Sequence, residues 1–254
     1  MESFAAVLLI GHGSRDLAAN HEFESFVKLY ALIHPKWNIK HAYVSFGNPK
    51  FKEIVKIFSL KHNKLLIIPV FLFPAYHVKQ DILKVLRQLK KEVPEFEFEI
   101  TLPIGIMSGW MPIIIRNIQE APYDIFKKNR SQILFVGISG RVNDLKSKAY
   151  FETLCQQITD HFHLEKYQAC FFDKTKPLFP DQLGKNIFLN IKNVLIMPYL
   201  LWDGKLFQQI QSEIQGFIKE QPHITVYTLP CLSKYSGLFQ MMDNYLHQDI
   251  NEIN

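Results

Sequence analysis

The sequence predicts an α/β protein of two similar domains, each a four-stranded parallel sheet flanked by helices. Two observations carry this prediction. Short apolar stretches alternate along the chain with segments whose apolar residues recur every three or four positions, which is typical of βαβ units and a parallel sheet. The pattern also occurs twice, because segments of the second half echo segments of the first in the same order. A chain of 254 residues can hold two such domains.

The first half alternates regularly between the two patterns. Continuous or alternating apolar runs predict strands at residues 4–10, 39–46, 65–72 and 96–102. Apolar residues spaced by three and four predict helices around residues 23–30, 51–58, 82–89 and 111–119. Each strand is therefore expected to be followed by a helix.

The second half repeats this plan at a nearly constant offset. Three segments correspond in order, with Gly137 in place of Gly11, Pro198 in place of Pro69 and Thr228 in place of Thr101. The offsets are 126, 129 and 127 residues, which favours an internal duplication. The polar stretch 121–131 is the expected linker, so we expect one domain at 1–125 and a second at 126–254.

Composition and charge argue against several classes of function. The longest strongly apolar stretches fall far short of the ~20 residues that cross a bilayer, and the N-terminus lacks the basic region of a signal peptide. We therefore expect a cytoplasmic protein without a membrane span. The net charge of +5 comes from scattered lysines and not from a long basic run, so nucleic-acid binding has little support. The three cysteines are widely separated, which argues against a disulfide framework or a zinc knuckle.

Two histidines are the candidate site residues, because each stands just beyond a predicted strand. His12 lies in Gly-His-Gly-Ser-Arg, and His77 lies in Phe-Pro-Ala-Tyr-His-Val-Lys. If the strand order is 2-1-3-4, both follow neighbouring strands and lie across one ligand crevice. Two neutral imidazoles could bind Co²⁺, Ni²⁺, Fe²⁺ or Zn²⁺, or act as acid and base near neutral pH. The second half has Ile138 in place of His12 and Lys205-Leu206 in place of Tyr76-His77, so we expect a single site, carried by the first domain.

Motifs for other chemistries are absent from the sequence. Gly11-x-Gly13 lacks the third glycine of a dinucleotide fingerprint, and no phosphate-binding Gly-x-x-x-x-Gly-Lys-Ser/Thr loop occurs. Residues 137–140 do not form the Gly-x-Ser-x-Gly turn of a serine hydrolase.

The two histidine motifs, at residues 9–16 and 69–82, resemble those of the class II chelatases. The chain is most similar to the long, two-domain CbiX-type sirohydrochlorin cobaltochelatases, and the similarity covers essentially its whole length. The resemblance implies a lyase that inserts a divalent metal into sirohydrochlorin, an acidic tetrapyrrole on the route to cobalamin or sirohaem, without an organic cofactor. Cobalt is the metal we expect, with Fe²⁺ and Ni²⁺ left open. A monomer suffices if two domains enclose one cleft.

The resemblance also implies roles for individual residues. His12 and His77 are expected to ligate the metal and to carry catalysis, since neutral imidazole can both bind a cation and accept a pyrrole proton. The residues expected to bind the substrate are Ser14, Arg15, Tyr76 and Lys79. Arginine suits this task because its fork pairs with a carboxylate through two hydrogen bonds.

One position departs from the family pattern. Ser45 stands where the family usually offers a glutamate after the second strand, and serine is a poor ligand for such metals. The cation would then be bound more weakly, through water, or with an acid from elsewhere, for which Glu53 and Asp81 are candidates. Two alternatives follow: a tetrapyrrole- or metal-binding protein without turnover, and a chelatase for another metal or macrocycle, such as iron and protoporphyrin.

Overall fold

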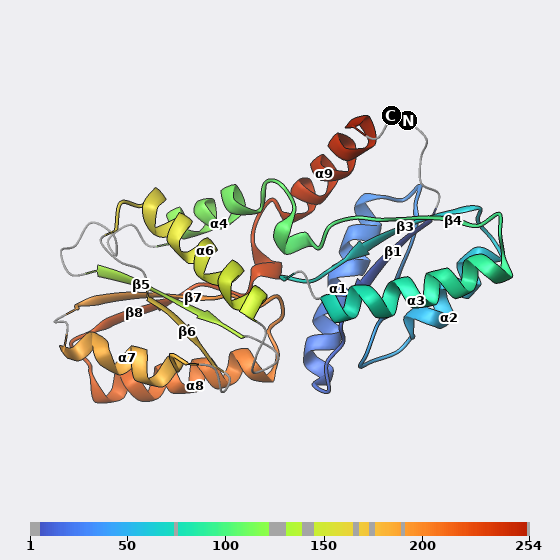
Figure 1. Ribbon diagram of the computed structural model, residues 1–254. Coiled ribbons are helices and arrows are strands. Elements are labelled where there is room, and N and C mark those ends of the chain that lie inside the picture. Colours follow the sequence, from blue (N-terminus) through green and yellow to red (C-terminus); the bar gives the residue numbers. More distant parts are fainter. Residues whose placement is uncertain are drawn as a thin grey trace. The chain divides into compact units, whose positions relative to one another are not determined.

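Two parallel four-stranded sheets organise the chain (Figure 1). The structure, a computed structural model, describes residues 6–73, 76–121, 131–138, 145–164, 168–172, 176–188 and 191–252. The chain divides into two compact units, of which the first comprises Met1–Ser108 and Met242–Asn254 and the second comprises Gly109–Met241. Within the described part of the chain, no helix combines the length and the apolar character that crossing a bilayer requires.

The first sheet confirms the predicted strands and their parallel arrangement. Its strands are β1 (Ala6–Gly11), β2 (Asn38–Tyr43), β3 (Lys64–Pro69) and β4 (Glu97–Ile100), in the order β2-β1-β3-β4. The helices of this half are α1 (Leu17–Ile33), α2 (Phe51–Ser59), α3 (Tyr76–Glu92), the short 3₁₀ helix η1 (Ile104–Ile106) and α4 (Trp110–Gln119). Strands β1 and β3 are hydrogen-bonded neighbours, so the loops that follow them leave the same edge of the sheet.

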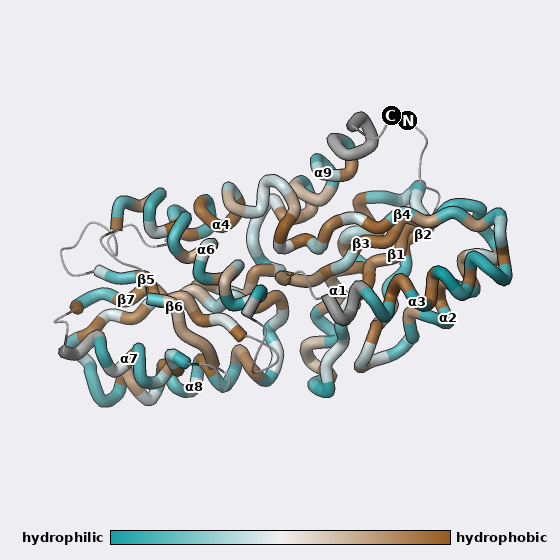
Figure 2. Tube along the Cα trace, in the orientation of Figure 1, coloured by the Kyte–Doolittle hydropathy of each residue, from teal (hydrophilic) through white to brown (hydrophobic). Residues whose placement is uncertain are grey.

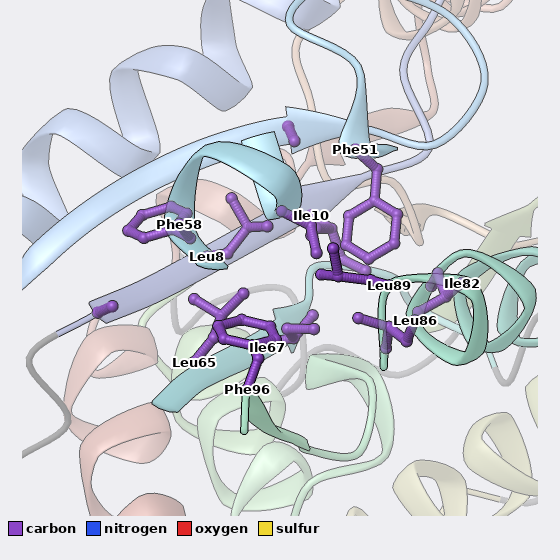
Figure 3. Packing of buried hydrophobic residues seen from close by; sticks show 13 residues of the cluster. Leu8, Ile10, Phe51, Phe58, Leu65, Ile67, Ile82, Leu86, Leu89 and Phe96 are labelled. Atoms are coloured by element: carbon purple, nitrogen blue, oxygen red, sulfur yellow. The ribbon is translucent and has the colours of Figure 1, made fainter. Parts of the chain in front are cut away.

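The central strands read as continuous apolar runs because helices cover both faces of the sheet. All six residues of β1 are buried, and this strand is brown in Figure 2. On one face the strand residues pack against α2 and α3 (Figure 3), in a cluster that includes Leu8, Ile10, Phe51, Phe58, Leu65, Ile67, Ile82, Leu86, Leu89 and Phe96. Helix α1 buries Phe23, Phe26, Val27 and Tyr30, which recur at helical spacing on one face.

The second sheet repeats the topology of the first. Its strands are β5 (Ser131–Gly137), β6 (Gln168–Phe171), β7 (Asn193–Pro198) and β8 (Thr225–Thr228), in the order β6-β5-β7-β8. The helices of this half are α6 (Leu145–His161), α7 (Phe179–Phe188), α8 (Lys205–Glu220), η2 (Leu232–Lys234) and α9 (Leu238–Glu252). The predicted fold class, two similar α/β domains, is confirmed.

The last helix of each repeat belongs largely to the unit built on the other sheet. Helix α4 follows β4 but lies in the second unit, where it contacts α6. Helix α9 follows β8, and its part from Met242 onward lies in the first unit. There the Asp243 carboxylate accepts a hydrogen bond from the Tyr30 hydroxyl at 2.7 Å. The same carboxylate oxygen lies 3.0 Å from His34 Nε2, also within hydrogen-bond distance. The units therefore divide after 108 and 241, whereas the expected boundary at 125/126 lies outside the described residues.

Candidate functional site

The carboxyl edge of the first sheet carries the candidate site. His12 directly follows the last residue of β1, and His77 is the second residue of α3, the helix that follows β3. Residues 74–75 lie outside the described residues, and the side chains of 76–79 do as well. The side-chain roles expected of Tyr76, His77 and Lys79 therefore remain predictions, while their backbone forms the first turn of α3.

Main-chain hydrogen bonds hold the His12 loop against the segment after β2. The carbonyl oxygen of His12 accepts from the amide of Ser45 at 3.0 Å and from the amide of Phe46 at 3.2 Å. Gly13 makes this approach possible, because a Cβ there would lie 1.3 Å from the carbonyl oxygen of Phe46. Its φ of +81° is also one that glycine adopts at little cost. We call this pairing of the two loops, residues 12–13 with 45–46, the loop clamp.

The clamp presents the His12 ring at the surface in a defined orientation. The imidazole is exposed, and its Nδ1 lies 3.2 Å from the carbonyl oxygen of Gly13. This contact favours the tautomer protonated at Nδ1, in which Nε2 carries the lone pair that can ligate a metal. Nε2 lies 3.5 Å from the hydroxyl oxygen of Ser45, which is long for a hydrogen bond. Ser45 therefore stands beside the candidate ligating atom.

The surroundings of Ser45 do not replace a missing carboxylate. The ammonium group of Lys50 donates to the carbonyl oxygen of Ser45 at 2.8 Å, which places a positive charge beside this position. Glu53 accepts from the Lys50 amide at 3.2 Å and so caps the start of α2. Asp81 lines a groove between α2 and α3 together with Lys52 and other residues of these helices. Among the residues that the structure describes, no group of three or more His, Cys, Asp or Glu could hold a metal ion.

Ser14 and Arg15, both expected to bind substrate, differ in their surroundings. Ser14 is built into the start of α1: its hydroxyl oxygen accepts from the Asp16 amide at 3.0 Å, and its amide donates to Asn20 Oδ1 at 2.8 Å. Arg15 is exposed, and its guanidinium carbon lies 5.1 Å from the centre of the Phe46 ring. The arrangement suits a structural role for Ser14 and a binding role for Arg15.

Sequence reasoning missed Phe46 because it placed the residue inside a strand. Strand β2 ends at Tyr43, where the chain turns back and the Tyr43 amide bonds the Pro49 carbonyl oxygen at 2.9 Å. Phe46 consequently lies in the loop, with 40% of its surface exposed and its ring centre 6.0 Å from that of His12. The signal that could have found it is the Phe-Gly-Asn-Pro sequence, which is typical of a turn.

Beneath these loops, Tyr43 ties β2 to α1. Its hydroxyl is 3.1 Å from both the Asn20 carbonyl oxygen and a Glu24 carboxylate oxygen. Burial, and then the adjacent Glu24 carboxylate, raise the pKa of the Tyr43 phenol above its ordinary value. The phenol therefore remains a hydrogen-bond donor at all physiological pH values. It supports Asn20, which in turn positions Ser14.

Comparison with known proteins identifies the family and supports the fold. The CbiX family model matches residues 6–121 and 142–249. The chain is 24% identical to a sirohydrochlorin cobaltochelatase of Priestia megaterium, over 86% of this chain and 71% of that one. It is 21% identical to a sirohydrochlorin ferrochelatase of Bacillus subtilis (strain 168), over 97% and 91% of the two chains. The structure of SirB from Bacillus subtilis with Fe³⁺ superposes with a TM-score of 0.76 at 18% identity, covering 97% of this chain and 95% of that one. Since the family model spans nearly all of both repeats, the chain belongs to the CbiX family.

Proposed function

We propose that this protein is a sirohydrochlorin chelatase, which inserts a divalent cation into the metal-free macrocycle. The observation that carries the proposal is the exposed His12 imidazole, held by the loop clamp at the carboxyl edge of the first sheet. Two relatives are named for this reaction, one with cobalt and one with iron. We propose Co²⁺ as the metal substrate. Fe²⁺ and Ni²⁺ are the alternatives, because imidazole binds all three cations.

The chemistry requires three events that imidazoles can assist. The hydrated cation must lose water, it must be held beside the macrocycle, and two pyrrole N–H protons must leave as the divalent cation binds the four ring nitrogens. In the proposal Nε2 of His12 replaces one water ligand, and His77 supplies the second imidazole. A neutral imidazole can also accept a pyrrole proton and pass it to solvent. Arg15, Lys79 and Tyr76 are proposed to bind the carboxylated rim.

Replacing the histidines tests the proposal. We expect His12→Ala and His77→Ala to reduce Co²⁺ insertion by about 100-fold or more, since each removes a ligand and a base. The rate of metal insertion is measured from the change in sirohydrochlorin absorption, and circular dichroism verifies that each variant is folded. His223→Ala is the matched control, because that exposed histidine lies in the second unit. Wild-type rates in both His12→Ala and His77→Ala would refute the proposed function.

Ser45 favours a second candidate function, a protein that binds the tetrapyrrole or the metal without turnover. A hydroxyl beside a lysine attracts a cation less than a carboxylate would, so the cation affinity at His12 is lowered. This candidate predicts tight binding of sirohydrochlorin without acceleration of metal insertion above the uncatalysed rate.

Restoring the acid distinguishes the two candidates. We expect Ser45→Glu to bind Co²⁺ about tenfold or more tightly, because an ionised oxygen ligand replaces a neutral one. If the parent is a slow chelatase, the variant is also faster at low metal concentration. If the wild-type protein does not insert metal and Ser45→Glu does, the wild-type protein is a binding protein without turnover. Ser59→Glu, at the other end of α2, controls for added negative charge.

A further inference from the structure

The exposed aromatic side chain of Phe46 lies next to the candidate ligand His12, and it belongs to neither of the two histidine motifs. Phe46 exposes 40% of its surface, although it belongs to a loop fixed on both sides. Its amide is held by the His12 carbonyl oxygen, and the following Gly47 adopts a φ of +105°. A Cβ at Gly47 would lie 2.8 Å from the ring of Tyr43, so the turn is packed tightly at this point. The backbone of Phe46 is therefore tied directly to that of His12.

The Phe46 ring also lies beside a cation. The guanidinium carbon of Arg15 is 5.1 Å from its centre, within the range of a cation–π contact, and the His12 ring is 6.0 Å away. A flat apolar surface flanked by an arginine fork and by an imidazole matches a planar macrocycle with a carboxylated rim. The ring can cover part of the apolar face while the arginine meets a carboxylate.

We propose that Phe46 is a substrate-positioning residue: the macrocycle packs against its ring, and the same ring holds the Arg15 guanidinium toward the rim. This inference rests on the proposed function, and it adds the residue that sets the orientation of the macrocycle over His12. Phe46 does not take part in ligation or proton transfer, so its contribution belongs to binding and leaves the chemical step to the imidazoles.

Titration of the protein with metal-free sirohydrochlorin tests the packing. We expect Phe46→Ala to raise the Kd about fivefold to tenfold, as loss of an aromatic contact does. Phe46→Tyr keeps the ring and is expected to retain the wild-type Kd, while Phe46→Leu falls between. In turnover the KM rises and kcat stays within about twofold, because the lost contact is made equally in the ground and transition states. Leu60→Ala is the control, since Leu60 is exposed at the far end of α2.

A double-mutant cycle tests the link to the arginine. If Phe46 orients Arg15, the effects of Phe46→Ala and Arg15→Met on the Kd are not additive, and the double variant loses less than the product of the two fold-changes. An unchanged Kd in folded Phe46→Ala overturns the inference while the proposed function stands. A wild-type protein that neither binds nor metallates sirohydrochlorin overturns both.

Discussion

The two repeats keep the same scaffold and differ in what their loops carry. In the first repeat, a Cβ on Gly11 would lie 2.9 Å from the Phe23 ring. In the second repeat, a Cβ on Gly137 would lie 2.8 Å from the Phe151 ring. Both glycines end the first strand of their sheet and let an aromatic residue of the next helix pack against it. Glycine at this place is thus a requirement of the fold, and it gives no information about chemistry.

The residue after each glycine carries that information instead. His12 is exposed in the first repeat, whereas Ile138 in the second packs against the core cluster of its unit. A similar contrast recurs on the neighbouring strand of each sheet. Tyr43 pairs with Gly11, and its hydroxyl bonds Glu24; Phe171, which pairs with Gly137, has no hydroxyl group. The two copies of the fold therefore differ at these positions in polar groups and not in topology.

The largest effect that tests this contrast is expected at the loop clamp. Gly13→Ala places a Cβ 1.3 Å from the Phe46 carbonyl oxygen at a φ of +81°, so the loops must separate. We expect a loss of at least about 2 kcal/mol in the free energy of unfolding, together with loss of sirohydrochlorin binding. Urea denaturation measures the free energy of unfolding, and titration with metal-free sirohydrochlorin measures binding.

A glycine of the second unit provides the matched control for that change. A Cβ on Gly216, in helix α8, would meet nothing within 4 Å beyond the adjacent backbone of its own helix. Gly216→Ala is therefore expected to stabilise the protein by up to about 1 kcal/mol, since alanine is the better helix former. Equal effects of the two substitutions would show that the clamp is not needed.

A smaller effect is expected when Tyr43 is made like its counterpart. Tyr43→Phe removes the hydroxyl that contacts Asn20 and Glu24, and we expect it to cost about 1 kcal/mol of stability. Because Asn20 positions Ser14, a modest rise in the Kd for sirohydrochlorin should accompany this loss. Tyr227→Phe, at a more exposed tyrosine of β8, controls for removal of a hydroxyl. A stability equal to that of wild type would contradict the structural role of Tyr43.

The smallest expected effect concerns pH. Burial, more than any other cause, lowers the pKa of His41 below its ordinary value of 6.5; Lys28 and Lys40 act in the same direction, and Glu24 opposes them. As the pH falls below about 6.5, the unfolded chain takes up a proton at this residue before the folded protein does, so stability decreases.

The second repeat has Ala169 at the position that corresponds to His41. We therefore expect His41→Ala to show a weaker fall of unfolding free energy between pH 7 and pH 5 than wild type, in urea denaturation at both pH values. His223→Ala, at an exposed site, should leave the wild-type slope unchanged. A wild-type slope in His41→Ala would assign the pH dependence to other groups.

Much of this architecture was predictable because buried parallel strands leave a strong pattern. The run before His12 and the run before Pro69 predict β1 and β3, and the repeat offset predicts a second sheet. The placement of α4 and α9 was not predictable, since an apolar helix face indicates burial without naming the surface that it meets. Phe46 was misplaced for a related reason: its apolar character favours a strand, while the turn before Pro49 decides its position. The side-chain role of His77 remains a prediction.

The exchanged terminal helices have a consequence for synthesis of the protein. The first sheet is complete once residue 100 has been added, but the helix segment that bonds Tyr30 and His34 through Asp243 is made only after all strands of the second sheet. Chains generally begin to fold from the N-terminus while translation continues. Here the contact with Tyr30 and His34 cannot form until Asp243 has left the ribosome, and a nascent chain truncated near residue 125 would leave that surface of the first unit uncovered.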